Sequence, residues 1–128
     1  MQFRDLHRQY EAMKAEIDEA MHSVVTSGAY IMGSHVSELE QQLADYVGVK
    51  HCITCGNGTD ALCMALMAMG IGKGDAVFVP DFTFFATAEV VAMIGATPIF
   101  VDVDRRTYNI DTDKLYEAAL TVMGDTDL

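Results

Sequence analysis

The sequence is poor in positive charge. Its 128 residues include 8 Lys and Arg against 19 Asp and Glu, which gives a formal net charge of −11. A nucleic-acid partner requires Lys and Arg to neutralise phosphates, and an anionic membrane surface attracts the same side chains. The charge balance therefore argues against both partners. It still allows one small phosphorylated ligand, held by backbone N–H groups.

The sequence also lacks long hydrophobic runs. No stretch is long enough to cross a bilayer, and residues 1–5 are polar and lead into a helical pattern, unlike a signal peptide. Hydrophobic residues nevertheless make up 51% of the chain. That content is enough to bury a core at this length, for which one domain is the first expectation.

Cysteines are few and odd in number: Cys52, Cys55 and Cys63. They form no disulfide framework, which suits a reducing cytoplasm. Cys52 and Cys55 have C-x-x-C spacing next to His51, so a redox or zinc site is an alternative. A redox pair usually opens a helix, and zinc would need a second pair of ligands. We therefore interpret these residues as buried strand cysteines and expect no metal.

The N-terminal part is predicted to be helical. Apolar residues at three- and four-residue steps predict an amphipathic helix over residues 4–27, with Gly28 as its stop. Ser34 is expected to cap a second helix that ends at Gly48. The loop between them, residues 29–33, is apolar and bounded by glycines. We expect this loop to pack against another surface.

From residue 50 the pattern changes to strands alternating with helices. Strands are predicted at 51–54, 76–79 and 98–103, and helices at 59–69, 84–94 and 111–120. This order predicts an α/β class with a mostly parallel sheet flanked by helices, preceded by the two N-terminal helices. We divide the chain into an N-terminal helical segment, 1–48, and an α/β part, 49–128. The sheet is small for the hydrophobic content, so we interpret 49–128 as an incomplete large domain in a truncated chain.

Two segments follow strands at the edge where open α/β sheets bind ligands. Residues 56–60 form a glycine turn that opens a helix, where unpaired N–H groups and the helix dipole favour a phosphate. The alternative is a plain turn capped by Thr59 or Asp60. The second segment contains Phe82, Phe84 and Phe85. One of these rings could be core, and another could offer a flat face to a planar cofactor.

Five motifs, in order and at matching intervals, resemble the sugar aminotransferases of the DegT/DnrJ/StrS type. They are F-x-D-L at 3–6, G-x-Y-I-x-G at 28–33, N-G-T-D-A-L at 57–62, F-T-F-x-A-T-A at 82–88 and G-A-x-P-x-x-V-D-x-D at 95–104, followed by T-Y-N-x-D at 107–111. The resemblance covers nearly the whole chain. It implies the N-terminal part of the fold-type-I large domain and the cofactor pyridoxal 5′-phosphate (PLP).

The resemblance also assigns site residues. Gly58, Thr59 and the backbone of Asp60 would bind the cofactor phosphate, and Phe84 would stack on the pyridine ring. Substrate contacts would come from the 28–33 loop, at Gly28 and Tyr30. His35 departs from the family, which usually has an acid there, and as a lone histidine it is also consistent with a surface residue.

No catalytic residue is assigned within these 128 residues. The resemblance implies a lysine that holds the cofactor as a Schiff base and an acid that protonates the pyridine nitrogen. Neither matches a residue of this chain, whose lysines are Lys14, Lys50, Lys73 and Lys114. We therefore expect this piece alone to be inactive.

Three functional readings stay open. The first is the front part of a cytoplasmic, homodimeric enzyme that transfers an amino group from glutamate to a nucleotide-linked keto sugar. The nearest likeness is to enzymes for UDP-linked 3-keto sugars of surface polysaccharides. The second is a dehydratase of the same family, with histidine in place of the lysine. The third is a non-enzymatic α/β module that binds a phosphorylated ligand.

Overall fold

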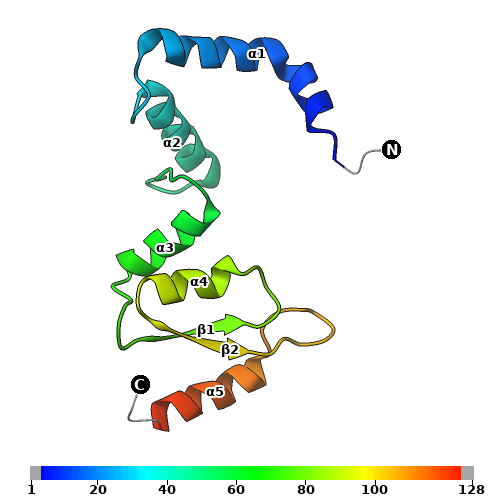
Figure 1. Cartoon of the computed structure of the whole chain (residues 1–128), viewed down its shortest axis with the longest axis vertical. Coiled ribbons are helices and arrows are strands. Elements are labelled where there is room, and N and C mark those ends of the chain that lie inside the picture. Colours follow the sequence, from blue (N-terminus) through cyan, green and yellow to red (C-terminus); the bar gives the residue numbers. More distant parts are fainter. Residues whose placement is uncertain (1–3, 125–128) are drawn as a thin grey trace. The chain divides into compact units, whose positions relative to one another are not determined.

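The computed structural model describes residues 4–124. The chain divides into two compact units, Met1–Thr54 and Cys55–Leu128. Figure 1 labels the helices and strands of each unit.

The first unit contains the long helix α1 (Leu6–Ser27). The Asp5 side chain accepts a hydrogen bond from the N–H of Arg8 at 2.9 Å and so begins the helix. Gly28 ends it in the left-handed region, at φ 68°, and donates its N–H to the carbonyl of Val24. The predicted helix and its glycine stop are confirmed. The periodic apolar residues end shortly before Gly28, so the apolar pattern and the glycine cap indicate the same end of the helix.

Helix α2 (Ser34–Val47) follows the loop. Gly48 ends it at φ 77°, as predicted. The predicted cap at Ser34 is wrong: Gly33 occupies the N-cap position, and no side chain caps this end. Ser34 already lies within the first turn, so its hydroxyl is past the position from which a side chain reaches the free N–H groups.

Residues 51–54 are not a strand in the structure, in contrast to the prediction. A strand requires a neighbour for its backbone groups, and the described part of the chain supplies none. Instead, Glu40 of α2 holds Thr54, accepting its N–H at 2.8 Å and its hydroxyl at 2.9 Å on one carboxylate oxygen. These two hydrogen bonds lower the pKa of Glu40.

The second unit alternates helices with strands. Its order is α3 (Gly58–Ala68), β1 (Ala76–Pro80), α4 (Ala86–Met93), β2 (Thr97–Val101) and α5 (Thr112–Gly124). Strands β1 and β2 pair in parallel, with Ala76 opposite Thr97 and Pro80 opposite Val101. Figure 1 shows α4 and α5 on opposite sides of this pair. The α/β class with a parallel sheet is confirmed.

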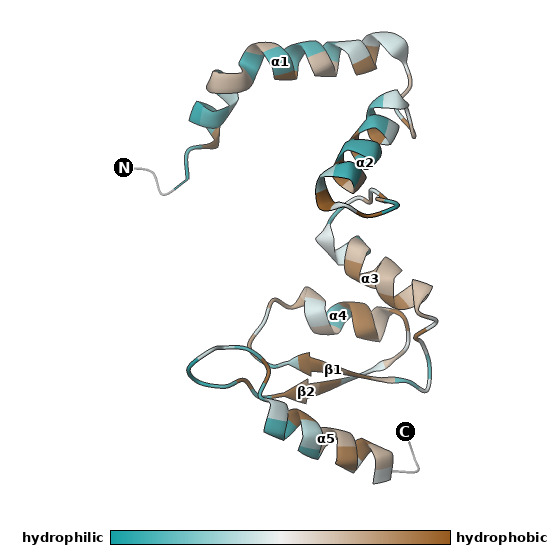
Figure 2. Cartoon of the chain, turned by 180° about the vertical axis from the view of Figure 1, so that it is seen from behind, coloured by the Kyte–Doolittle hydropathy of each residue, from teal (hydrophilic) through white to brown (hydrophobic). Residues whose placement is uncertain are grey.

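The core of this unit lies between α4 and the strands. Its buried side chains are Val79, Val90, Val91 and Ala96, with Cys63, Leu66 and other half-buried apolar residues packed around them. The strands and most of α4 are accordingly coloured as hydrophobic in Figure 2. The cluster is small, and many large apolar side chains elsewhere stay exposed, including Leu62, Met67, Tyr116 and Leu120.

Within 4–124, none of the helices combines the length and the apolar content that crossing a bilayer requires.

Candidate functional site

The turn at residues 55–60 is closed by Asn57. Its side-chain oxygen accepts the N–H of Asp60 at 2.9 Å, and its amide nitrogen donates to the Asp60 carboxylate at 3.0 Å. Asn57 is the N-cap of α3. The alternative prediction, a plain turn capped by Thr59 or Asp60, is therefore wrong about the capping residue. The Asn side chain could have been found from its place two residues before Thr59, since Asn is among the best N-caps.

Two glycines shape this turn in different ways. A Cβ at Gly56 would lie 2.8 Å from the Asp60 carboxylate, closer than real contacts allow. A Cβ at Gly58 would meet nothing within 4 Å. A side chain at Gly56 would thus force the Asp60 carboxylate to shift from its hydrogen bond with Asn57, whereas a Cβ at Gly58 would be accommodated without a contact.

The donors at this terminus suit a phosphate. Gly58 and Thr59 are the first two residues of α3, so their N–H groups have no carbonyl one turn earlier in the helix. Thr59 is half-buried and adds a hydroxyl. The N–H of Asp60 is already bonded to Asn57. A phosphate would therefore use Gly58 and Thr59 first, and would reach Asp60 only by displacing the Asn57 oxygen.

The aromatic segment, residues 82–85, follows β1 in the same unit. Phe82, Phe84 and Phe85 are 67%, 77% and 74% exposed. The expectation that one of these rings is core is wrong, because α4 begins only at Ala86 and the core forms from its later turns. Phe84 and Phe85 line a hollow of about 280 Å³ together with Asp81, Thr83, Ala88 and Phe100.

The backbone of Phe84 is fixed although its ring is exposed. Its carbonyl accepts the N–H of Thr87 at 3.0 Å. The hydroxyl groups of Thr83 and Thr87 lie 3.0 Å apart and join the two ends of this turn. Phe84 can therefore present a ring face from a defined position.

The loop at residues 28–33 belongs to the first unit. Tyr30 donates its N–H to the carbonyl of Gly28 at 3.1 Å and its hydroxyl to the carbonyl of Val25 at 3.3 Å. Tyr30, Ile31 and Met32 are 66%, 89% and 68% exposed. The expectation that this apolar loop is packed is not met among the described residues, where the loop is left open.

An apolar hollow lies beside this loop. Its volume is about 460 Å³, and it is lined by Ala20, Met21, Val24, Val25, Tyr30 and His35. The imidazole Nε2 of His35 lies 3.0 Å from the Ser23 hydroxyl, so His35 joins α2 to α1. His35 is exposed, as expected for a surface histidine.

The cysteines differ from the prediction. Cys52 and Cys63 are half-buried, and Cys55 is exposed. Cys52 and Cys55 are not buried strand residues, because residues 51–54 have no strand partner in the described chain. Between residues 4 and 124, no three His, Cys, Asp or Glu side chains gather as metal ligands do.

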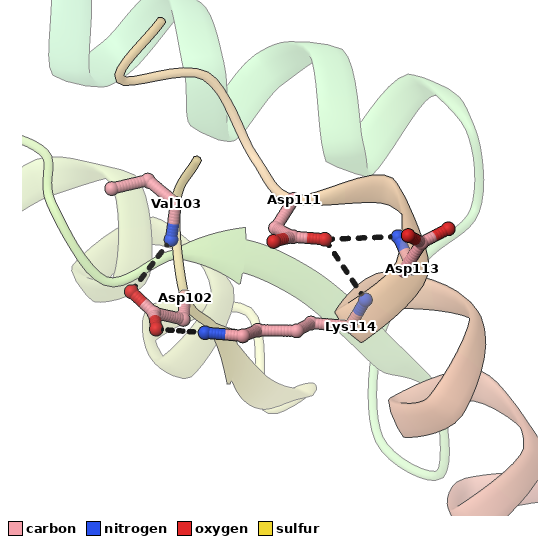
Figure 3. A network of polar contacts seen from close by, with 5 residues as sticks. All are labelled: Asp102, Val103, Asp111, Asp113 and Lys114. Carbon is pink, nitrogen blue, oxygen red and sulfur yellow. Dashed lines mark hydrogen bonds and ion pairs between the residues drawn. The ribbon is translucent and has the colours of Figure 1, made fainter. Parts of the chain in front are cut away.

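Sequence reasoning missed one polar network, shown in Figure 3. The carboxylate of Asp102 accepts the N–H of Val103 and pairs with the ammonium of Lys114. The Asp111 carboxylate accepts the N–H groups of Asp113 and Lys114 at 3.0 and 3.2 Å. Lys114 and the N–H of Val103 lower the pKa of Asp102, and Asp102 raises the pKa of Lys114. The network fastens the end of β2 to the start of α5.

Comparison with known proteins gives a family match over most of the chain. The DegT/DnrJ/EryC1/StrS aminotransferase family matches residues 11–122. A UDP-2-acetamido-2-deoxy-3-oxo-D-glucuronate aminotransferase of Pseudomonas aeruginosa is 52% identical over 121 residues, which cover 94% of this chain and 33% of that protein.

Solved structures give the same result. A DegT DnrJ EryC1 StrS aminotransferase from Brucella abortus superposes with a TM-score of 0.92 at 50% identity, covering 100% of this chain and 34% of that one. NtdA from Bacillus subtilis, with bound cofactor PMP, gives 0.79 at 33% identity over 84% of this chain and 25% of that one. The chain thus spans about a third of the length of the relatives it matches.

Proposed function

The chain belongs to the DegT/DnrJ/EryC1/StrS aminotransferase family, and on this basis we propose that it is part of a PLP-dependent sugar aminotransferase. The complete enzyme would transfer an amino group from glutamate to a UDP-linked 3-keto sugar. Within it, residues 1–48 would form the helical segment with the substrate loop. Residues 49–128 would form the first part of the cofactor-binding domain.

The observation that carries this proposal is the N-terminus of α3. The N–H groups of Gly58 and Thr59 lie in the first turn of α3, at the positive end of the helix dipole, and a Cβ at Gly58 would meet nothing within 4 Å. Thr59 adds a hydroxyl group. This donor set suits the dianionic phosphate of PLP. Thr59 would orient the phosphate, and Asn57, which is hydrogen-bonded to the Asp60 side chain, would hold the turn in shape.

Phe84 would supply the surface for the cofactor ring. Its ring is exposed and its backbone is fixed by Thr87. When bound, PLP supplies an electron sink for bonds next to the transferred nitrogen. The residues of this chain would bind and orient that group and would exclude water from one face of it.

We place the lysine that holds PLP outside these 128 residues. Lys14 lies 2.5 Å from Asp18, and Lys114 is paired with Asp102. Both pairings raise the lysine pKa, whereas a nucleophilic amine requires a lowered one. Lys50 and Lys73 are exposed, and neither matches the position of the Schiff-base lysine that the family resemblance implies. The piece alone would then be inactive.

The Pseudomonas relative, whose name specifies a UDP-linked 3-oxo sugar, supports the proposed substrate class. Gly28 and Tyr30 would contact the nucleotide sugar from the open loop beside the 460 Å³ hollow. We also propose a cytoplasmic homodimer. The exposed apolar side chains of α1, among them Leu6, Met21 and Val25, offer surface for such an assembly.

The test uses the full-length polypeptide that contains this chain. With PLP, glutamate and a UDP-linked 3-keto sugar, we expect formation of 2-oxoglutarate and of the amino sugar. Thr59→Ala should weaken PLP binding about tenfold or more, because a hydrogen bond to a charged group is lost, whereas Thr59→Ser should not. Glutamate-independent loss of water from the sugar would favour the dehydratase. Absence of PLP binding by the unmodified enzyme would favour the non-enzymatic module.

A further inference from the structure

The loop between β2 and α5 brings a tyrosine to the aromatic segment. The rings of Phe82 and Tyr108 have centroids 5.5 Å apart and an interplanar angle of 40°. Residues 82 and 108 belong to the same unit and are separated by β2 and α4 in the sequence. This is a tertiary contact, and the spacing of the motifs does not predict it.

The contact lies outside the core. Phe82 is 67% exposed and Tyr108 is 62% exposed. Neither ring belongs to the cluster around Val91 or to the half-buried residues packed against it. The pair is therefore not needed to fill the interior, and its effect is local to the two segments that carry it.

Tyr108 is held in an uncommon backbone conformation, with φ 59°. Its N–H donates to the Asp104 carbonyl at 2.8 Å, and the N–H of Asp104 donates to the Asn109 carbonyl at 2.9 Å. The Asp104 carboxylate accepts the N–H groups of Arg106 and Thr107 at 3.1 and 2.8 Å. A non-glycine residue keeps a positive φ only where its surroundings determine it. These four hydrogen bonds do so.

The base of the loop is closed as well. Val103 and Ile110 form an antiparallel bridge, and the N–H of Asp111 donates to the Asp102 carbonyl at 3.0 Å. The ion pair of Asp102 with Lys114 then joins this base to α5 (Figure 3). Tyr108 therefore lies on a loop whose backbone is held by hydrogen bonds both at its base and at its turn.

The aromatic segment is fixed at its two ends. The N–H of Asp81 donates to the Val101 carbonyl at 3.0 Å, and the carbonyl of Phe84 accepts from Thr87. Between these points, the ring of Tyr108 contacts Phe82 from a distant part of the sequence. Phe82 is two residues from Phe84.

We propose that Tyr108 is a positioning residue for the cofactor site. Its ring supports Phe82, and through Phe82 it holds the turn that presents the face of Phe84. The inference rests on the proposed function in one respect, the stacking of Phe84 on the cofactor ring. A polar or small residue at position 108 would leave Phe82 unsupported and allow the turn to move.

The test compares Tyr108→Ala with Tyr108→Phe in the full-length protein. The first readout needs no cofactor: it is hydrogen exchange of the amides of Asp81 and Thr87, which flank the segment and donate to the carbonyls of Val101 and Phe84. We expect Tyr108→Ala to raise this exchange about threefold or more, while exchange in the β1–β2 pair is unchanged. Tyr108→Phe, which keeps the ring, should match the unmodified protein.

The second readout is PLP affinity. We expect Tyr108→Ala to weaken PLP binding about three- to tenfold, with Tyr108→Phe unaffected. The double variant with Phe82→Ala should add nothing further, because both changes break one contact. Additive effects would overturn the proposal, as would unchanged exchange in Tyr108→Ala or a Tyr108→Phe variant that behaves like Tyr108→Ala.

Two controls separate this proposal from the proposed function. If Phe84→Ala leaves PLP binding unchanged, the stacking role fails, while the exchange readout still decides whether Tyr108 holds the turn. If Tyr108→Ala does not fold, Phe82→Leu tests the same contact from the other side. Phe82→Leu is then expected to raise the same exchange, and no change would overturn the proposal.

Discussion

At the residue scale, the shape of the glycine turn at residues 56–60 depends more on Gly56 than on Gly58. The Asp60 carboxylate occupies the space that a methyl group on Gly56 would need, at 2.8 Å, whereas the space around Gly58 is open. The sequence presents both as equivalent members of a G-x-G turn. The two glycines differ because the Asp60 side chain, which is paired with Asn57, lies beside Gly56 and not beside Gly58.

Gly56→Ala should therefore destabilise the protein, and Gly58→Ala should not. The first substitution forces Asp60 away from Asn57 and disturbs the cap, at a cost of about 1 kcal/mol or more. The second adds a side chain in open space at a helical position and should be neutral or slightly stabilising. Urea unfolding of the two full-length variants checks this. Equal losses would contradict the assigned difference.

Asp104 gives the loop of Tyr108 a dependence on pH. The N–H groups of Thr107 and Arg106 lower the pKa of its carboxyl in the folded protein, whereas the unfolded carboxyl titrates near 3.9. A lowered folded pKa means that the stabilising contribution is present above about pH 4 and is lost as the pH falls through the folded value.

Asp104→Asn tests this sign. The amide oxygen can still accept a hydrogen bond but does not titrate, so the difference in Tm between the unmodified protein and this variant should shrink below about pH 4. Thermal unfolding between pH 2.5 and 6 measures it. A carboxyl midpoint by NMR at or above the unfolded value would contradict the lowered pKa.

At the scale of elements, helices were more predictable from the sequence than strands. The ends of α1 and α2 at Gly28 and Gly48 follow from local chemistry, since a glycine in the left-handed region stops a helix wherever it occurs. Residues 51–54 carry strand-forming side chains, but pairing depends on a neighbour that local sequence does not specify. The cap at Asn57 was predictable in principle. The Tyr108–Phe82 contact was not, because it depends on how the loop after β2 closes.

The end of α1 offers a test of one such local effect. Gly28 has φ 68°, and a Cβ there would meet nothing within 4 Å. Gly28→Ala should thus cost about 1 kcal/mol through backbone strain alone. Gly28→Asn should cost less, because asparagine tolerates this conformation. Chemical unfolding followed by circular dichroism measures both, and a larger loss in Gly28→Asn would show that contacts rather than φ govern this position.

At the scale of the whole molecule, the buried interior is small compared with the apolar surface left open. Within residues 4–124, the buried hydrophobic residues are Ala44, Val79, Ala86, Val90, Val91, Ala96 and Val101. Large side chains of α1, α3 and α5 stay exposed, as do those of the 28–33 loop and the aromatic segment. Exposed apolar surface on this scale marks interaction surfaces. It agrees with a chain that spans about a third of its relatives.

The pairing of lysines with carboxylates across the molecule bears on where a covalent bond to the cofactor can form. A lysine forms a bond with the PLP aldehyde only as a free amine, and pairing with a carboxylate stabilises the protonated form. Asp18 stabilises the protonated form of Lys14 in this way, and Asp102 stabilises that of Lys114.

The 128-residue polypeptide incubated with PLP and borohydride should therefore show no saturable labelling of one lysine, whereas the full-length protein should be labelled at one lysine outside residues 1–128. Peptide mapping by mass spectrometry distinguishes the two. Saturable labelling of Lys50 or Lys73 in the short chain would place the covalent site within it and overturn the proposed division of the active site.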